Sequence, residues 1–281
     1  MIKLLATDLD GTLLRRDGTI SDRTCRALEA ARDAGMMTVL VTARPPRTVR
    51  ARAHAVGIGG PAICCNGANV YDLDQDHMTG HTPLTPHVAR GLVLALREAI
   101  PGVRFAVELG VRSGWEPGFA TLRPVVREQA AGVEDDALVL CSEPVTKLIA
   151  CHSDLPADEL LRIAQTLVGE TAHVTHSGAP YVEISAAGVK KAWALAALCT
   201  QLAVPPSEVV AFGEMPNDVP MLVWAGRGVA VANAHPEVLR AADEVTDSNE
   251  EDGVAVVIEQ LLQGKRSSTA ASLIPPAVCP E

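Results

Sequence analysis

The sequence predicts an α/β fold in which a parallel sheet is interrupted by an inserted α+β unit. Apolar runs typical of buried strands alternate with helix-like segments near both ends of the chain, and polar residues follow several of these strands directly. Between Pro83 and Ala186 the pattern changes. A strand, a helix and a second strand within residues 2–42 form a βαβ unit, which requires parallel pairing.

Composition limits the class of protein. A chain of 281 residues, of which 48% are hydrophobic, can bury the core of one or two domains. The formal net charge of -10 argues against a nucleic-acid or anionic-membrane partner. No apolar run reaches the ~18 residues of a membrane span, and a strand begins at once without a signal region. Seven cysteines with no CxxC spacing favour reduced thiols, so we expect a cytoplasmic protein.

The first apolar run, Ile2–Ala6, leads to two carboxylates one residue apart, Asp8 and Asp10. Alternation along a strand places both on the same side, although the turn that follows can move one relative to the other. Carboxylates at the end of a buried strand are costly unless something holds them. Mg²⁺ can do so while leaving coordination positions for phosphate oxygens. The alternative is a pair of solvated loop residues.

The second buried strand is expected to end beside the first. Ser21 is predicted to cap a helix that stops at Gly35, and the strand Met36–Val41 then ends at Thr42. The carboxyl ends of parallel strands lie at one edge of the sheet, so Thr42 is expected close to the two aspartates. Four arginines follow: Arg44, Arg47, Arg50 and Arg52. Most are expected on a solvated helix face, and together they could steer an anionic substrate.

The third strand, Ala62–Cys65, precedes Asn66-Gly67, a dipeptide typical of tight turns. The insert then begins with a helix at Thr85-Pro86. Further strands, an amphipathic helix and a hairpin are expected in it: Phe105–Glu108, Lys147–Cys151, Asp158–Val168, Ala172–His176 and Tyr181–Ile184. This mixture predicts an α+β unit, and no pattern within it identifies a ligand.

After the insert, two consecutive lysines, Lys190 and Lys191, stand at the start of an apolar helix. Positive charges at a helix start oppose the helix dipole, which makes a purely structural role harder to argue. A buried strand, Val209–Phe212, then ends in the acidic segment Gly213-Glu214-Met215-Pro216-Asn217-Asp218.

The last part of the chain contains one more strand, which ends at Asn233, and a final helix, Val254–Leu262. Residues 264–281 are rich in Ser, Ala and Pro and are expected to form a disordered tail.

Four segments resemble, in the right order, the four motifs of the haloacid dehalogenase (HAD) superfamily of phosphatases. They are Asp8-Leu9-Asp10-Gly11-Thr12-Leu13, Thr42-Ala43-Arg44, Gly188-Val189-Lys190-Lys191 and Gly213-Glu214-Met215-Pro216-Asn217-Asp218. The resemblance covers residues 2–262 and is to the Cof-like, type IIB branch. It implies a Rossmann-like parallel-sheet core, residues 1–82 and 187–263, with an inserted C2-type cap, residues 83–186. Such a cap closes over the site, excludes water and recognises the leaving group.

The resemblance also implies a role for each motif. Asp8 would be the nucleophile that becomes an aspartyl-phosphate. Asp10 would protonate the leaving oxygen and then activate water, so that one hard step is divided into two. Thr42 and a motif lysine would bind the phosphoryl group, the lysine by neutralising charge on the nucleophile and the phosphoryl oxygens. The motif alignment gives Lys191 and leaves Lys190 as the alternative.

The implied cofactor is Mg²⁺, held by Asp8, Glu214, Asp218 and the backbone carbonyl of Asp10. Further residues are implied around the phosphate: Gly11, Thr12, Ala43, Arg44, Asn66, Gly67, Asn217 and Asn233. For Asn66-Gly67, an ordinary turn is an equally good interpretation. Ala43 and Ala192 replace glycines of the family pattern, and Glu214 replaces an aspartate. The longer Glu214 side chain could weaken the Mg²⁺ site.

We therefore expect a Mg²⁺-dependent phosphomonoester hydrolase that acts on a small phosphorylated metabolite, such as a sugar phosphate. Alternatives are a phosphomutase, a catalytically weakened protein that binds a phosphorylated ligand, and a specialised biosynthetic sugar-phosphate phosphatase. Four cap residues are candidates for specificity: Arg112, Trp115, His176 and Glu183. For each, a place on the cap surface or in the cap core is the simpler interpretation. The protein is expected to be a monomer or a homodimer.

Overall fold

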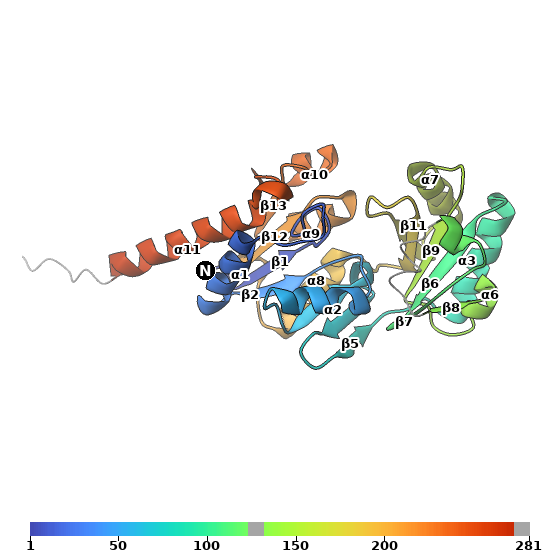
Figure 1. The fold of residues 1–281 in the computed structure, drawn as a ribbon, viewed down its shortest axis with the longest axis horizontal. Helices are drawn as coiled ribbons and strands as arrows, with labels where there is room; N and C mark the ends of the chain where they lie inside the picture. The colour runs from blue at the N-terminus through green and yellow to red at the C-terminus, as the bar shows by residue number, and fades with distance from the viewer. Residues whose placement is uncertain (123–131, 273–281) are drawn as a thin grey trace, which may run out of the picture.

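The computed structural model describes residues 1–122 and 132–272 and contains a five-stranded parallel sheet in the order β14-β13-β12-β1-β2 (Figure 1). Its strands are β1 Leu4–Thr7, β2 Met37–Leu40, β12 Val209–Gly213, β13 Arg227–Val231 and β14 Glu244–Thr246. Strand β1 pairs with both β2 and β12, so segments from opposite ends of the chain form the centre of the sheet. The predicted α/β core is confirmed.

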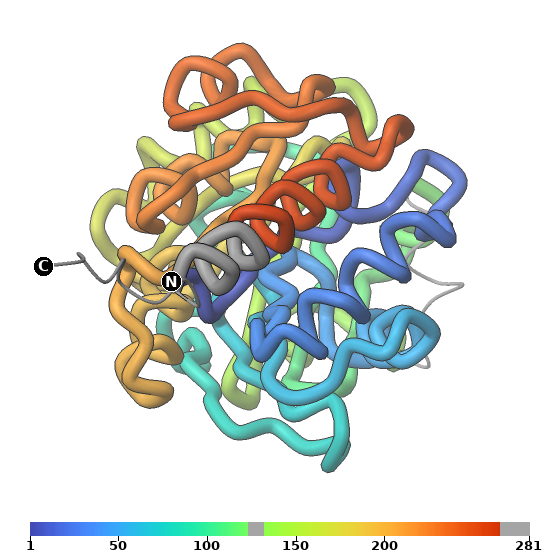
Figure 2. Tube along the Cα trace, turned by 90° about the vertical axis from the view of Figure 1, so that its left-hand side faces the viewer, coloured from blue at the N-terminus to red at the C-terminus, as the bar shows by residue number. Residues whose placement is uncertain are grey.

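Helices pack around this sheet. They are α1 Asp22–Asp33, α2 Pro46–Ala55, α8 Lys191–Gln201, α9 Val219–Trp224, α10 Pro236–Ala241 and α11 Gly253–Ser272. Short 3₁₀ turns are η1 Cys65–Gly67, η2 Pro206–Glu208, η3 Pro216–Asp218 and η4 Asn249–Glu251. Helix α11 lies beside α1 (Figure 2). The predicted cap of α1 is confirmed, since the Ser21 hydroxyl accepts a hydrogen bond from the backbone N–H of Thr24.

Strand β3, Pro61–Cys64, is joined to the main sheet by an isolated parallel bridge between Val41 and Ile63. It pairs in antiparallel fashion with β4, Asn69–Asp72, which pairs in turn with β5, His77–His81. The sequence did not indicate β4 or β5, because both are short and partly exposed. This small sheet leads into the insert.

The insert is a six-stranded sheet in the order β10-β11-β9-β6-β7-β8, antiparallel except for β7 with β8. Its strands are β6 Arg104–Leu109, β7 Arg112–Trp115, β8 Gly132–Glu134, β9 Lys147–Cys151, β10 Ala172–Thr175 and β11 Val182–Ala186. Its helices are α3 Pro86–Ala99, α4 Phe119–Leu122, α6 Ala137–Leu140 and α7 Ala157–Val168. Alternate strand residues such as Phe105, Leu148 and Ile184 pack with α3 and α7 in one apolar cluster.

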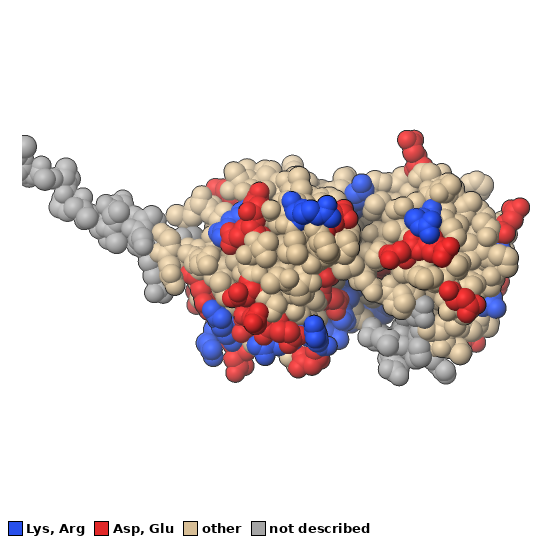
Figure 3. Space-filling model, turned by 90° about the horizontal axis from the view of Figure 1, so that it is seen from above, with Lys and Arg blue, Asp and Glu red and all other residues tan. Residues whose placement is uncertain are grey.

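The core and the insert bury separate apolar clusters. One draws on residues 4–73 and 194–258, the other on residues 84–184. This separation supports the proposed core, 1–82 and 187–263, and the proposed cap, 83–186. Figure 3 shows two lobes with a constriction between them and charges of both signs on the face in view. Within residues 1–122 and 132–272, no helix is long and apolar enough to cross a membrane.

The expectation of a disordered tail from residue 264 is wrong for residues 264–272, which continue α11 to Ser272. A single glycine, Gly264, costs a helix only about 1 kcal/mol relative to alanine, so it does not end one that is already formed. The rest of the proposed tail, residues 273–281, lies outside the described residues. Strand β7 was not predicted, because the polar segment Arg112–Trp115 contains Gly114, yet pairing with β6 gives it backbone partners.

Candidate active site

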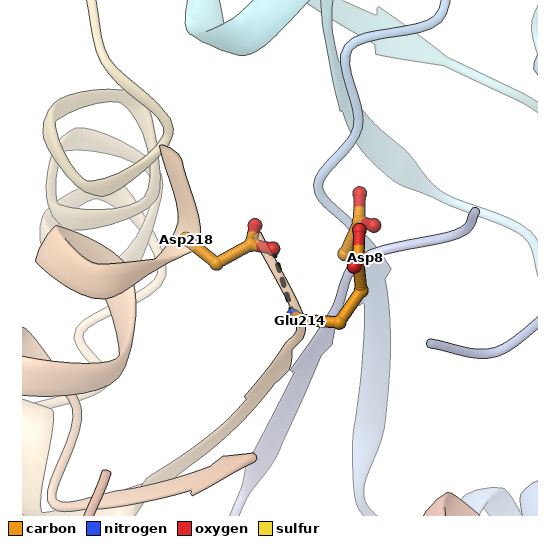
Figure 4. Close-up of side chains that lie close together, drawn as sticks. All are labelled: Asp8, Glu214 and Asp218. Carbon is orange, nitrogen blue, oxygen red and sulfur yellow. Dashed lines mark hydrogen bonds between the residues drawn. The ribbon is translucent and has the colours of Figure 1, made fainter. Parts of the chain in front are cut away.

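Three carboxylates meet at the carboxyl edge of the central strands (Figure 4). Asp8 directly follows β1, Glu214 directly follows β12, and Asp218 lies in the η3 turn. Because β1 and β12 are paired in parallel, their ends bring these residues together. One oxygen of each carboxylate lies within 4.8 Å of the others.

The Asp218 carboxylate organises the turn after β12. It is fully buried, and its Oδ2 accepts hydrogen bonds of 3.0 Å from the backbone N–H groups of Glu214 and Met215. Its Oδ1 accepts a hydrogen bond of 2.6 Å from the Nζ of Lys191. A buried carboxylate needs such partners, and here they fix both the turn and the lysine.

Lys191 begins α8 and is buried against the nucleophile candidate. Its Nζ donates a hydrogen bond of 2.6 Å to Asp8 Oδ1, whereas Lys190 is an exposed residue at the N-cap. Gly67 has a φ of +103°, and a Cβ there would lie 2.6 Å from the Lys190 carbonyl oxygen. A glycine is therefore needed for the turn after β3 to approach the start of α8 this closely. Of the two lysines, Lys191 is the one that contacts Asp8.

We call Asp8, Lys191, Glu214 and Asp218 the floor of the site. Burial raises the pKa of Asp8 to about 7, an effect opposed by Lys191 and reinforced by Asp218. Burial, together with Asp8 and Asp218, raises the pKa of Glu214 to about 8. When ionised, three carboxylates against one ammonium leave an excess of negative charge. Oxygen donors with such an excess fit a hard divalent cation, so the residues present suit the expected Mg²⁺.

The Asp10 carboxylate is not part of this cluster and is paired with Arg44. Two hydrogen bonds of 2.6 Å join the Arg44 guanidinium to the two Asp10 oxygens, in the fork geometry typical of arginine and carboxylate. The Arg44 backbone N–H donates to the Thr42 hydroxyl at 3.1 Å. The first two motifs are thus joined directly.

Two predicted phosphate neighbours, Gly11 and Asn233, instead shape the turn after Asp10. Gly11 has a φ of +72°, and a Cβ there would lie 3.2 Å from the Glu214 side chain. Asn233 Nδ2 donates a hydrogen bond of 2.8 Å to the Gly11 carbonyl oxygen, and Asn233 Oδ1 accepts one from the backbone N–H of Asn249. Thr12 is buried, and its hydroxyl has no hydrogen-bond partner in the described residues.

A cavity of about 260 Å³ lies between this edge and the insert. Eight of the predicted site residues line it: Asp8, Asp10, Thr42, Ala43, Arg44, Lys191, Glu214 and Asn217. Six others do not line it: Gly11, Thr12, Asn66, Gly67, Asp218 and Asn233. Asn66 is in the η1 turn, where its amide accepts a hydrogen bond from Asn217 and donates one to Glu183.

The opposite wall of the cavity carries three charged residues of the insert, Glu108 on β6, Lys147 on β9 and Glu183 on β11. We call them the roof. The sequence did not single out Glu108 or Lys147, and it did not say which of the four arginines leave the solvated helix face. Arg47 is one of them, since it lines the cavity and donates a hydrogen bond of 2.9 Å to Glu108. A charged residue at the end of an otherwise apolar strand was the available signal.

The other candidate specificity residues lie elsewhere. Arg112 is exposed and pairs with Glu143, and Trp115 packs with Phe119 in a small buried cluster. His176 pairs with Asp158 at 3.1 Å and lines a second cavity behind the Asn66 turn. Of the four candidates, Glu183 alone lines the cavity over Asp8.

Comparison with known proteins places the chain in a family. A profile of haloacid dehalogenase-like hydrolases matches residues 5–258. The chain is 30% identical over 272 residues to a 5-amino-6-(5-phospho-D-ribitylamino)uracil phosphatase of Bacillus subtilis, covering 92% of this chain and 96% of that protein. It is 30% identical over 275 residues to a pyridoxal phosphate phosphatase of Escherichia coli, covering 91% and 97%.

Solved structures agree with this result. A haloacid dehalogenase-like hydrolase from Bacteroides thetaiotaomicron superposes with a TM-score of 0.78 and 28% identity, covering 93% of this chain and all of that one. The alignment therefore includes both the parallel-sheet core and the inserted cap. The chain belongs to the haloacid dehalogenase-like hydrolases, as a phosphatase of their Cof-like branch.

Proposed function

We propose that the protein is a Mg²⁺-dependent phosphomonoesterase that acts on a small sugar phosphate through an aspartyl-phosphate. An Asp8 oxygen attacks phosphorus, the bond to the leaving oxygen breaks, and Asp10 gives that oxygen a proton. Water then attacks the aspartyl-phosphate, Asp10 takes its proton, and inorganic phosphate leaves. The observation that carries this proposal is the Asp8 carboxylate, which lines the cavity while Lys191 holds it at 2.6 Å.

The floor supplies the electrostatics of this reaction. Lys191 lowers the pKa of Asp8 against the effect of burial, which favours the ionised nucleophile. It also offers positive charge to the phosphoryl oxygens as charge develops on them. Asp8, Glu214, Asp218 and the Asp10 carbonyl would hold Mg²⁺, which supplies further positive charge to the same oxygens when bound.

Asp10 has to change its partner to act as the acid. In the structure both of its oxygens accept hydrogen bonds from Arg44, at the mouth of the cavity. A carboxyl group that donates a proton needs at least one oxygen free to carry it. We propose that Arg44 turns toward the phosphoryl group of a bound substrate and that Asp10 is released in the same movement.

The relatives support a small substrate. Those from Bacillus subtilis and Escherichia coli are named as phosphatases of a ribitylamino uracil phosphate and of pyridoxal phosphate, and both are matched over nearly their whole length. A phosphomutase would have to retain a bisphosphate in the cavity. A protein that only binds a phosphorylated ligand would not need the buried contact between Lys191 and Asp8.

The test is phosphate release from p-nitrophenyl phosphate with Mg²⁺ and with EDTA, for the wild type and for Asp8→Asn. We expect turnover that requires Mg²⁺ and that is abolished by Asp8→Asn. Turnover unaffected by Asp8→Asn would contradict the assignment of the nucleophile. Absence of turnover by a folded wild type, on this ester and on a panel of sugar phosphates, would overturn the hydrolase proposal.

A further inference from the structure

The roof is built by strand alternation. Glu108 and Lys147 are direct partners in the antiparallel pair of β6 and β9, and Glu183 lies on β11, on the other side of β9. Their neighbours Val107 and Leu148 point to the opposite face, in the apolar cluster with α3 and α7. All three charged side chains are therefore on the face of the cap sheet that lines the cavity.

Each roof residue also contacts the core. Lys147 Nζ donates to Glu183 and, at 2.8 Å, to the carbonyl oxygen of Ala43. Glu183 Oε2 accepts a hydrogen bond of 3.1 Å from Asn66. Glu108 accepts both hydrogen bonds of the Arg47 guanidinium. The described structure thus has the cap sheet seated directly over the motif residues.

Packing alone does not explain these charges. The side chains of Lys147 and Glu183 are 3% and 1% exposed. Removing such groups from water is costly, and an apolar pair of similar volume is often as stabilising as a buried ion pair. Buried charges that line a cavity are more often tied to a ligand.

The hydrogen-bond donors and acceptors that the roof leaves unused indicate which chemical group of a ligand would fit there. An ammonium has three donors, and Lys147 uses two of them in the contacts above. Each Glu183 oxygen accepts one hydrogen bond and has room for another. A hydroxyl group, which both donates and accepts, satisfies a carboxylate and an ammonium together.

The cavity offers no spare cation to a second anionic group. In the described part of the chain each cation that lines it is paired with a carboxylate: Arg44 with Asp10, Arg47 with Glu108, Lys147 with Glu183, and Lys191 with Asp8 and Asp218. A second phosphate or a carboxylate on the substrate would face Glu108 and Glu183 without a free partner, which is unfavourable in a buried site.

We infer that Lys147 and Glu183 form a specificity pair that binds neighbouring hydroxyl groups of the leaving alcohol, so that the enzyme selects monophosphates of neutral, polyhydroxylated compounds over substrates with a second anionic group. This inference rests on the proposed phosphomonoesterase activity and gives it a structural basis in the cap. Neither residue takes part in the chemical step. They position the leaving group over Asp8.

The first experiment measures kcat/KM of the wild type with Mg²⁺ for three kinds of substrate. These are glucose 6-phosphate and sorbitol 6-phosphate, then fructose 1,6-bisphosphate and phosphoglycolate, with p-nitrophenyl phosphate as reference. We expect kcat/KM for the two phosphates of neutral polyols to exceed kcat/KM for the two substrates with a second anionic group by at least about tenfold. Turnover of the aryl ester with a preference for the bisphosphate or phosphoglycolate would overturn the inference and leave the proposed function standing. No turnover of any ester would instead show that the proposed function itself has failed.

The second experiment changes the balance of positive and negative charge in the roof. Glu183→Gln keeps the shape of the side chain but leaves the Lys147 ammonium without its carboxylate. We expect the ratio of kcat/KM for the bisphosphate to that for sorbitol 6-phosphate to rise about tenfold. The double variant Lys147→Gln with Glu183→Gln removes both charges, so it should lose the polyol preference without gaining the bisphosphate.

The matched control is Glu116→Gln. Glu116 is also a buried cap carboxylate with an arginine partner, Arg97, but it does not line the cavity. We expect this variant to leave the substrate ratios at their wild-type values. Two results would show that the roof has only a structural role and that the inference is wrong. One is that Glu183→Gln lowers kcat/KM for every substrate by the same factor. The other is that Glu116→Gln shifts the ratio of kcat/KM for the bisphosphate to that for sorbitol 6-phosphate as much as Glu183→Gln does.

Discussion

The floor and the roof of the cavity are both made of buried charges, but they are balanced differently. The floor sets three carboxylates against one lysine, and burial raises the pKa of both Asp8 and Glu214. The roof sets two carboxylates against Lys147 and, from the core, Arg47. An excess of buried negative charge is stable only with a cation or with bound protons, whereas a balanced set needs neither. The floor is therefore suited to a metal and a phosphate, and the roof to a neutral group.

The largest effect should come from the only cation of the floor. Lys191→Met is expected to lower kcat by about 10³-fold, because it removes a preorganised positive charge from the nucleophile and the phosphoryl oxygens. Since Lys191 lowers the pKa of Asp8, its loss should also move the acidic limb of the kcat/KM profile to higher pH. Steady-state kinetics over a range of pH would check both results.

Lys190→Met is the control for that variant. Lys190 is exposed and next to Lys191 in the chain, so its substitution should change kcat by less than about threefold. A loss in Lys190→Met equal to that in Lys191→Met would mean that the motif lysine had been assigned to the wrong residue.

A smaller effect on activity is expected from substitution of Glu214, the acid that replaces an aspartate of the family pattern. Glu214→Gln removes one charged ligand, so the Mg²⁺ concentration for half-maximal activity should rise by about 10- to 100-fold. Titration of activity with Mg²⁺ would measure it. Glu29→Gln, an exposed change on α1, should leave the titration unchanged. An unchanged Mg²⁺ requirement in Glu214→Gln would exclude this side chain from the metal site.

The charge excess of the floor should also appear in the stability of the protein without metal. The pKa values of Asp8 and Glu214 rise in the folded state from 3.8 and 4.5 to about 7 and about 8, so the folded protein binds protons that the unfolded chain has released. Stability from these groups is therefore present at low pH and is lost as the pH rises from about 4 to about 8. In EDTA we expect Tm to fall by about 5 °C or more between about pH 5.5 and about pH 8, and Mg²⁺ to reduce this fall. A Tm in EDTA that stays level or rises over this range would contradict the described electrostatics.

The contrast between floor and roof also explains which parts of the site the sequence could predict. Asp8 and Thr42 come at the ends of buried strands, so the local pattern alone placed them at one edge of the sheet, and the motif resemblance added Glu214. The motif alignment favoured Lys191 over Lys190, but the contact with Asp8 is a tertiary one that the sequence does not contain. The roof could be found only from the structure. Glu108 and Lys147 are far apart in sequence, and their role depends on which face of the cap sheet the helices cover.

The smallest effect should come from replacing the roof pair by apolar residues. Lys147→Met with Glu183→Leu removes both charges together, so no buried ion remains uncompensated. We expect the free energy of unfolding, measured by urea denaturation in EDTA, to change by less than about 1 kcal/mol, whereas Lys147→Met alone should lower it by about 3 kcal/mol. A loss of about 3 kcal/mol in the double variant would mean that the pair holds the cap together. In that case the charges of the roof would serve the fold of the cap, and their assignment to a neutral group of the ligand would lose its support.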